Sequence, residues 1–287
     1  IGVLNGRRAD LARNLPSAEA LAEFLQAEDK RPIQNGTINY KHLEKEIRFE
    51  SIAFAYDRGA EPILRGIDFS IPKGTSLAIV GESGAGKTTI ADLLCRFCDV
   101  TEGAILLDDH DIREFDVRSL RRSIGLVSQD TFLFNNTIGY NIRYGRPDAT
   151  ESEVIQAATQ AHALSFIQEL PLGFDSPVGE RGALLSAGEC QRIAIARALI
   201  SDPDILILDE ATSSLDPLSE HSVQEALEEL MHDRTTLIIA HRLATVKKAG
   251  KIAVLGGGQI VEMGSHEELI ERNGLYRKMC EIGSAIV

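Results

Sequence analysis

One short segment limits the possible folds of this chain more than any other. It reads Gly81-Glu82-Ser83-Gly84-Ala85-Gly86-Lys87-Thr88 and fits the pattern G-x-x-x-x-G-K-[ST] at every fixed position. The apolar run Ser76 to Val80 precedes it, and helically spaced apolar residues, among them Ile90 and Leu93, follow it. A glycine-rich turn between a buried strand and a helix indicates an α/β fold whose sheet is mainly parallel.

The residues of this loop are suited to bind the phosphates of a nucleotide. Glycines let the backbone curl so that successive N–H groups point inward, and the following helix adds its N-terminal dipole. Lys87 is predicted to reach the β- and γ-phosphates, and Thr88 to coordinate Mg²⁺ through its hydroxyl. A chance glycine-rich turn is the alternative, which the flanking strand and helix disfavour. The predicted phosphate-binding residues are Gly81, Glu82, Ser83, Gly84, Ala85, Gly86, Lys87, Thr88 and Thr89.

A second motif supplies the acidic groups that such a loop requires. Four aliphatic residues, Ile205 to Leu208, end in Asp209 and Glu210. Asp209 is predicted to hold Mg²⁺ through water, and Glu210 to polarise the attacking water as a general base. An ordinary strand end with a helix-capping aspartate is the alternative, and the phosphate-binding loop disfavours it.

The hydrophobic pattern divides the rest of the chain. Ile47 to Tyr56 nearly alternates between apolar and polar residues, which predicts an antiparallel strand with one buried face. Ile205 to Leu208 and Leu237 to Ala240 are predicted to join Ser76 to Val80 as buried parallel strands. The segment of about a hundred residues between the first and second of these parallel strands is predicted to be largely helical. Its clearest helical patterns are Glu151 to Glu169 and Glu189 to Ile200.

The N-terminal part is predicted to be a separate region. Apolar residues between Leu11 and Leu25 fall on one helical face, and a polar linker, Asp29 to Thr37, follows them. The chain opens at Ile1 in mid-pattern, which suggests a piece of a longer protein. No run approaches the roughly 20 apolar residues that a membrane-spanning helix requires.

Charge and cysteine content argue against a nucleic-acid-binding protein and against a disulfide-stabilised one. The formal net charge of −13 and pI near 5.0 argue against nucleic acid as a partner, because phosphate-binding surfaces need clustered Lys and Arg. Four scattered cysteines are too few for a disulfide framework and fit a reducing compartment. Cys95 and Cys98 lack a second pair or a histidine cluster that would complete a metal site, so they are predicted to pack a helix.

A third motif, Leu185-Ser186-Ala187-Gly188-Glu189 followed by Cys190 to Leu199, resembles the signature of ABC ATPases. The resemblance implies ATP and Mg²⁺ as cofactors, and Ser186, Gly188 and Glu189 as an anion site that faces the nucleotide of a second subunit. It also implies a P-loop NTPase core, an N-terminal antiparallel β subdomain and a helical ABC-specific subdomain at about 130–200. Ala187 departs from the usual glycine, and its Cβ is expected to crowd the γ-phosphate or to require a negative φ.

Four other elements match this family residue by residue. Tyr56 stands where the family has an aromatic residue that stacks on adenine; core packing is the alternative. Gln129 resembles the Q-loop glutamine that contacts Mg²⁺ and water, and otherwise is an exposed loop residue. Ser214-Leu215-Asp216 resembles the D-loop, and otherwise caps a helix. His241 resembles the switch histidine at the γ-phosphate, where a structural histidine is the alternative.

Three segments resemble the exporter branch of the family. Val178 to Gly182 resembles an exporter-specific loop, Phe132 to Ile142 a surface that receives coupling helices, and 1–28 the cytoplasmic extension of the last transmembrane helix. The resemblance therefore divides the chain into 1–28, a linker 29–46 and an ABC ATP-binding domain 47–287. It implies a second ABC ATPase domain, identical or paralogous, and transmembrane coupling helices as partners, at the cytoplasmic face of the cell membrane. Lipid, peptide, drug and metal–thiol conjugates remain open as substrates.

Two other classes remain as alternatives. A soluble ABC ATPase of DNA repair needs a long coiled coil between the motifs, and one of translation carries two such domains; neither a heptad run nor a second phosphate-binding loop is present. A regulatory ATP-binding module that lacks hydrolysis is supported only by Ala187. The joint presence of Lys87, Asp209, Glu210 and His241 opposes it.

Overall fold

The computed structural model describes residues 15–17, 19, 33–57, 59–128, 131–209, 217–239 and 243–284. Most of the predicted N-terminal helix therefore lies outside the described residues. Among the described helices, none has both the length and the apolar character needed to cross a bilayer.

A small antiparallel sheet forms one layer of the core. Its predicted first strand is present as β1, and alternate side chains of that strand, such as Ile47 and Phe49, are buried. The strand order is β2 (Leu64–Pro72), β1 (Glu46–Phe54), β4 (Glu102–Leu107) and β5 (His110–Asp111).

A larger sheet forms the second layer, and its central strands are parallel, as the apolar runs predicted. The order is β10 (Gln259–Gly264), β9 (Lys251–Gly256), β3 (Ser76–Gly81), β8 (Thr235–Ile239), β7 (Ile205–Asp209) and β6 (Ile124–Val127). Within it only β10, at one edge, is antiparallel to its neighbour. Because β3 and β7 are parallel, the phosphate-binding loop and Asp209 both lie at the carboxyl ends of their strands, on the same side of the sheet.

The helix α2 (Lys87–Leu94) lies between the two sheets. Its Ile90 and Leu93 pack in one cluster with Phe49 of β1 and Ile207 of β7. A second cluster covers the other face of the parallel sheet and includes side chains of α7 (Ala187–Ser201) and α8 (Pro217–Met231). The remaining short elements are η1 (Ile112–Glu114), α3 (Val117–Arg122), η2 (Gly173–Asp175), η3 (Glu180–Gly182), α9 (Leu243–Lys247), α10 (His266–Glu271) and α11 (Leu275–Ser284).

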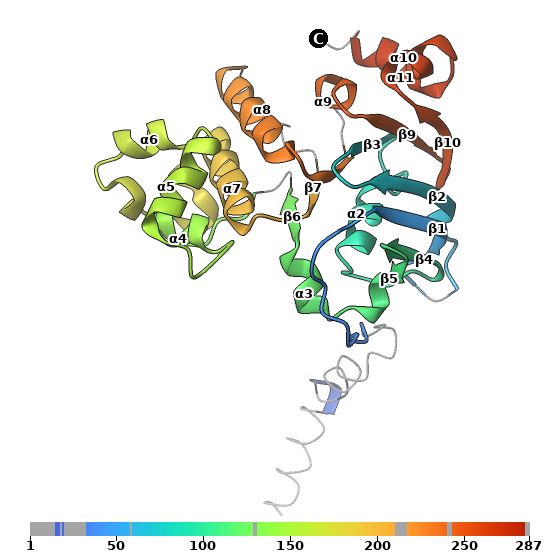
Figure 1. The fold of residues 1–287 in the computed structure, drawn as a ribbon, viewed down its shortest axis with the longest axis horizontal. Coiled ribbons are helices and arrows are strands. Elements are labelled where there is room, and N and C mark those ends of the chain that lie inside the picture. The colour runs from blue at the N-terminus through green and yellow to red at the C-terminus, as the bar shows by residue number, and fades with distance from the viewer. Residues whose placement is uncertain are drawn as a thin grey trace, which may run out of the picture.

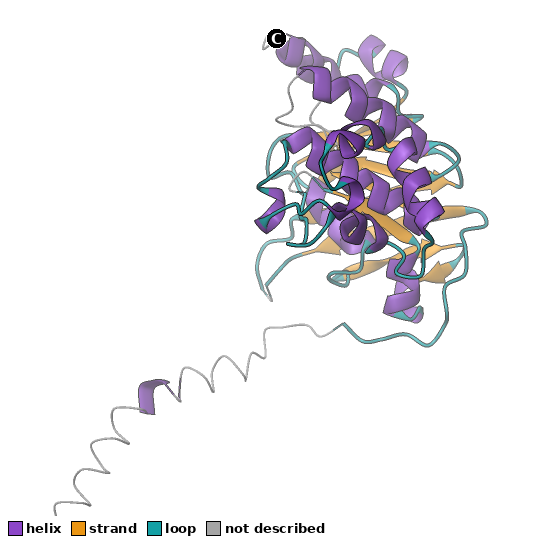
Figure 2. Ribbon diagram, turned by 90° about the vertical axis from the view of Figure 1, so that its left-hand side faces the viewer, coloured by secondary structure: helices purple, strands orange, loops and turns teal. Residues whose placement is uncertain are grey.

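The helical subdomain projects to the left of the sheets in Figure 1, and Figure 2 views the molecule from that side. It contains α4 (Ile138–Arg143), α5 (Glu151–Gln160), α6 (Leu164–Glu169) and α7. The predicted helical region was too long, because β4, β5 and β6 lie within its first part. The pattern from Glu151 to Glu169 also forms two helices, since the chain turns at His162, whose φ is 52°.

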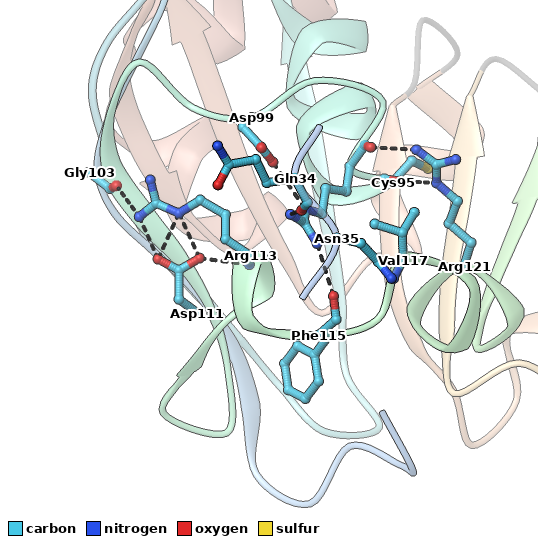
Figure 3. A network of polar contacts seen from close by, with 11 residues as sticks. Gln34, Asn35, Cys95, Asp99, Gly103, Asp111, Arg113, Phe115, Val117 and Arg121 are labelled. Carbon is cyan, nitrogen blue, oxygen red and sulfur yellow. Dashed lines mark hydrogen bonds and ion pairs between the residues drawn. The ribbon is translucent and has the colours of Figure 1, made fainter. Parts of the chain in front are cut away.

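Residues 33–46, predicted as part of a linker, lie along the core as an N-terminal strap. The backbone N–H groups of Thr37 and Ile38 donate to the Glu114 carbonyl, and a Cβ at Gly36 would lie 2.2 Å from that carbonyl group. Arg96, which is fully buried, donates to the carbonyls of Gln34 and Phe115 and pairs with Asp99. Figure 3 labels these three partners. The strap is therefore attached to the end of α2 and to the segment before α3.

The cysteines show no sign of a reactive pair. Cys95 caps the end of α2 and is buried, as predicted for a packing residue, whereas Cys98 lies beyond the helix and is half-buried. Burial raises the pKa of Cys95 to about 12 and that of Cys98 to about 11. Both thiols are therefore protonated near neutral pH.

Candidate nucleotide-binding site

The predicted phosphate-binding loop connects β3 to α2. Gly86 is the N-cap of α2 with φ of 102°, and a Cβ there would lie 2.8 Å from the Leu64 side chain. A residue with a side chain at this position is therefore strained twice, by its backbone and by its contact with β2. Within the loop Gly81, Gly86, Lys87 and Thr89 are buried, Ala85 is half-buried, and Glu82, Ser83, Gly84 and Thr88 are exposed.

Lys87 is folded into the loop that it follows. The residue is 6% exposed, and Nζ donates to the carbonyl oxygens of Gly81 and Glu82 at 2.9 Å each. These bonds hold the positive charge of the ammonium group against the backbone of the loop. A phosphate group that enters the loop meets this ammonium and the N–H groups at the start of α2.

Asp209 ends β7 on the same edge of the sheet. It pairs with Ile239 of β8, and Ile239 pairs in turn with Ile79 of β3, so Asp209 is level with Ile79 two strands away. At the usual strand spacing this places the two backbones roughly 10 Å apart. The half-buried Asp209 and the exposed Thr88 of α2 thus lie on neighbouring elements at one edge.

The donor groups at this edge fit Mg²⁺. A hydroxyl and a carboxylate are hard oxygen ligands, and Mg²⁺ binds few protein ligands while keeping waters and substrate phosphates. No group of three or more His, Cys, Asp or Glu side chains suited to a metal occurs in the part of the chain that the structure describes.

Tyr56 lies beside the loop and is not a core residue. It follows β1 and is 53% exposed, which contradicts the core-packing alternative. Its ring packs edge-to-face on Phe54 with centroids 4.9 Å apart, and its hydroxyl lies 3.2 Å from Thr89 Oγ1 on α2.

The signature residues begin α7. Ser186 is the N-cap, and its side chain forms a capping box with Glu189: Ser186 N and Oγ donate to Glu189 Oε2 at 2.8 and 2.9 Å, while Glu189 N donates to Ser186 Oγ at 3.3 Å. Ser186 and Ala187 are exposed, and Gly188 is buried. The start of this helix thus faces outward.

The negative φ that a side chain at Ala187 was expected to require is available at this position. Ala187 is the first residue of α7 and is not among the described residues with positive φ. Alanine fits a helix start without strain, so this substitution leaves the backbone of the signature intact.

Other predicted residues lie outside the described part of the chain. They are Gln129, Glu210, Ser214, Leu215, Asp216 and His241. Their predicted roles in water activation, metal binding and the subunit interface stay predictions.

Sequence reasoning missed Arg197, the residue that organises the surface after Thr131. From α7 its guanidinium donates to the Phe132 carbonyl and to the backbone and side-chain oxygens of Asn141. It also lies 5.8 Å from the ring centroids of Phe134 and Tyr144. An arginine on a helix with a buried apolar face was the only sequence signal.

A groove of about 420 Å³ lies between the core and the helical subdomain. Its lining includes the aromatic residues Phe132, Phe134 and Tyr144, and also Arg121 and Arg122 of α3. Phe132 and Tyr144 are more than half exposed. The groove therefore joins an apolar surface to a cationic edge.

Comparison with protein families matches residues 64–213 to the family described as ABC transporter. The chain belongs to the ABC transporter family. The matched segment runs from β2 past the end of β7 and contains the phosphate-binding loop, Asp209 and the signature. The chain is an ATP-binding ABC domain, and the family assigns it ATPase activity.

Individual relatives place this ABC domain close to those of exporters. It is 50% identical over 274 residues to the ATP-dependent lipid A-core flippase of Legionella pneumophila (strain Paris), covering 96% of this chain and 46% of the flippase. It is 48% identical over 271 residues to the heterocyst differentiation ATP-binding protein HepA of a Nostoc species, covering 94% of this chain and 44% of HepA.

A solved structure of a bacterial Atm1-family ABC exporter with ATP bound has the same fold. Its TM-score is 0.82 at 42% identity, and the match covers 94% of this chain and 47% of that one. The chain thus spans about half the length of the relatives that it matches.

Proposed function

We propose that this chain is the ATP-hydrolysing domain of an ABC exporter and acts with a second ABC domain, either identical or paralogous. The observation that carries the proposal is Lys87, an almost fully buried cation whose Nζ is held by two loop carbonyls where phosphates would bind. Two domains close head to tail around two ATP molecules, each held by the phosphate-binding loop of one and Ser186 of the other.

Each group has a distinct task in this closed state. Lys87 exchanges its loop carbonyls for the β- and γ-phosphates, and Thr89 with the loop N–H groups completes the cradle. Ser186, which shares its hydroxyl with Glu189 in the described structure, turns that hydroxyl to the partner's γ-phosphate. Thr88, Gln129 and, through water, Asp209 would hold Mg²⁺, which supplies neutralising charge for the phosphates.

Hydrolysis depends on residues next to this cradle. Glu210 accepts a proton from the attacking water, and His241 orients the γ-phosphate. Cleavage removes the phosphate that links the two domains, and the pair reopens.

The groove beside Arg197 is suited to bind the coupling helices of the transmembrane part. Exposed Phe132 and Tyr144 offer an apolar contact, and Arg121 and Arg122 favour acidic groups on the incoming helix. An exporter of this arrangement places the chain at the cytoplasmic face of the cell membrane. Relatives of the flippase and export type support this reading.

Mixing two inactive variants tests the shared site. Ser186→Arg blocks the signature and Lys87→Ala blocks the loop, so each alone is expected to be nearly inactive. Mixed equally, half the dimers pair the two variants and hold one intact site of two, so about a quarter of the parent ATPase activity should return. Specific activity of the parent chain should also rise with its concentration. No recovery on mixing, with a specific activity independent of dilution, would place the whole site in one chain.

A further inference from the structure

We infer that the Tyr56 hydroxyl is a positioning group for the nucleobase: its contact with Thr89 fixes the aromatic ring on which the base of ATP stacks. The inference rests on the proposed ATP site and on the base-stacking role that the family resemblance implies for Tyr56, and it adds how that ring is held. The observations that carry it are the exposure of the ring, the burial of its anchor and the place of that anchor on α2.

The Tyr56 ring has few neighbours that could hold it. It lies beyond the end of β1 and is 53% exposed, and among the described aromatic residues it packs only on Phe54. An exposed side chain without an anchor changes rotamer on the picosecond to nanosecond scale. Ligand binding would then bear the cost of ordering it.

The hydroxyl supplies the missing anchor. Tyr56 Oη lies 3.2 Å from Oγ1 of Thr89, which is 6% exposed and stands in the first turn of α2. The backbone of Thr89 is fixed by the helix, so the bond holds the far end of the Tyr56 ring against α2. The ring is thereby attached at both ends, by its own backbone and by its hydroxyl.

The same turn of α2 carries Lys87 and Thr88. The hydroxyl of Tyr56 is therefore held by the same helical turn that carries the phosphate-binding groups. Asp92, one turn further along α2, also interacts with this hydroxyl. Burial raises the pKa of Asp92, and the interaction with the Tyr56 hydroxyl acts to lower it. One element thus sets the distance between the base and the phosphates.

The test separates the base from the phosphates by comparing two ligands. Dissociation constants of Mg²⁺-ATP and of Mg²⁺ with inorganic tripolyphosphate, which has no base, are measured by calorimetry on the full 287-residue chain. Tyr56→Phe removes only the hydroxyl and Tyr56→Ala removes the ring. Tyr140→Phe, at an exposed tyrosine of α4, is the matched control.

We expect Tyr56→Phe to weaken ATP binding about two- to tenfold, the range of one lost hydrogen bond, and to leave tripolyphosphate binding unchanged. Tyr56→Ala should weaken ATP binding further with the same selectivity, and Tyr140→Phe should change neither ligand. Thr89→Val should bring no added loss of base-dependent affinity in the Tyr56→Phe background, because the Tyr56–Thr89 bond is already absent there.

Each other result overturns a different statement. If Tyr56→Ala leaves the preference for ATP over tripolyphosphate unchanged, the ring does not bind the base, and the base-stacking role expected of Tyr56 fails with the inference. If Tyr56→Ala weakens ATP but Tyr56→Phe does not, the ring stacks without the hydroxyl, and the inference alone fails. Equal weakening of both ligands by Tyr56→Phe would show that the bond supports the phosphate loop instead.

Discussion

The Arg197 guanidinium on α7 donates to the backbone carbonyl of Asn141 at 2.9 Å and to its side-chain oxygen at 2.8 Å. Asn141 is itself buried and donates to the Phe134 and Thr137 carbonyls, so one pair of residues fixes the loop before α4. The helix that carries Arg197 begins directly after its N-cap, Ser186, so the signature and part of the lining of the groove belong to one element, α7.

Replacing Arg197 with Leu should lower the free energy of unfolding by about 2–4 kcal/mol. The change leaves two oxygens of the buried Asn141 and the Phe132 carbonyl without their donor. Burial lowers the pKa of Arg197, which indicates that little solvent is present to replace the lost bonds. Urea unfolding measures the change. Arg118→Leu, at an exposed arginine of α3, is the control, and equal stability of the two variants would contradict the role given to Arg197.

Lys87→Ala should weaken ATP binding about ten- to a hundredfold, since it removes a charge-assisted contact to the phosphates. Calorimetry with Mg²⁺-ATP measures the loss. Lys73→Ala removes the same charge from an exposed turn and should leave the affinity unchanged. An unaltered affinity in the Lys87 variant would remove the observation on which the proposed function rests.

Glu210→Gln should leave ATP binding intact and reduce hydrolysis about a hundredfold or more, because an amide keeps the shape but accepts no proton. ATP-bound dimers should accumulate and elute earlier in size-exclusion chromatography. The control is Glu229→Gln, at an exposed carboxylate of α8. Hydrolysis at the parent rate would assign the base to another residue.

Ala187→Gly should not raise the ATPase rate, because Ala187 occupies a helix start without backbone strain. It should instead lower the free energy of unfolding by up to about 1 kcal/mol, the cost of glycine relative to alanine in a helix. Ala194→Gly on the same helix gives the reference for that cost. A faster ATPase in the Ala187→Gly variant would show that the methyl group crowds the γ-phosphate.

Local patterns predicted much of the fold and of the site. The alternation from Ile47 to Tyr56 identified β1, and three apolar runs identified β3, β7 and β8 because buried parallel strands are short and uniformly apolar. The loop motif predicted the position of Lys87 because the residue before it, Gly86, has a positive φ and no room for a Cβ, and glycine meets both conditions.

What the sequence missed depends on contacts between distant segments. The region after α2 was predicted to be helical, yet β4 and β6 gain their stability from β1 and β7, which lie far away along the chain. The Tyr56–Thr89 and Arg197–Asn141 contacts join residues 33 and 56 positions apart, and no period or spacing indicates them. The capping box of Ser186 and Glu189 is local, and its S-x-x-E pattern could have been recognised.

The N-terminal strap has a mechanical consequence. Its described hydrogen bonds include those to Arg96, Asp108, Glu114 and Asp116, which all belong to the two-sheet part of the chain. None of the described bonds of the strap is to α4, α5, α6 or α7. A pull on the chain ahead of Ile33 is therefore carried first into the far end of the helix that begins at Lys87. Because these bonds are spread along successive strap residues, they share the load, and the strap acts as a tether that moves the core as a unit.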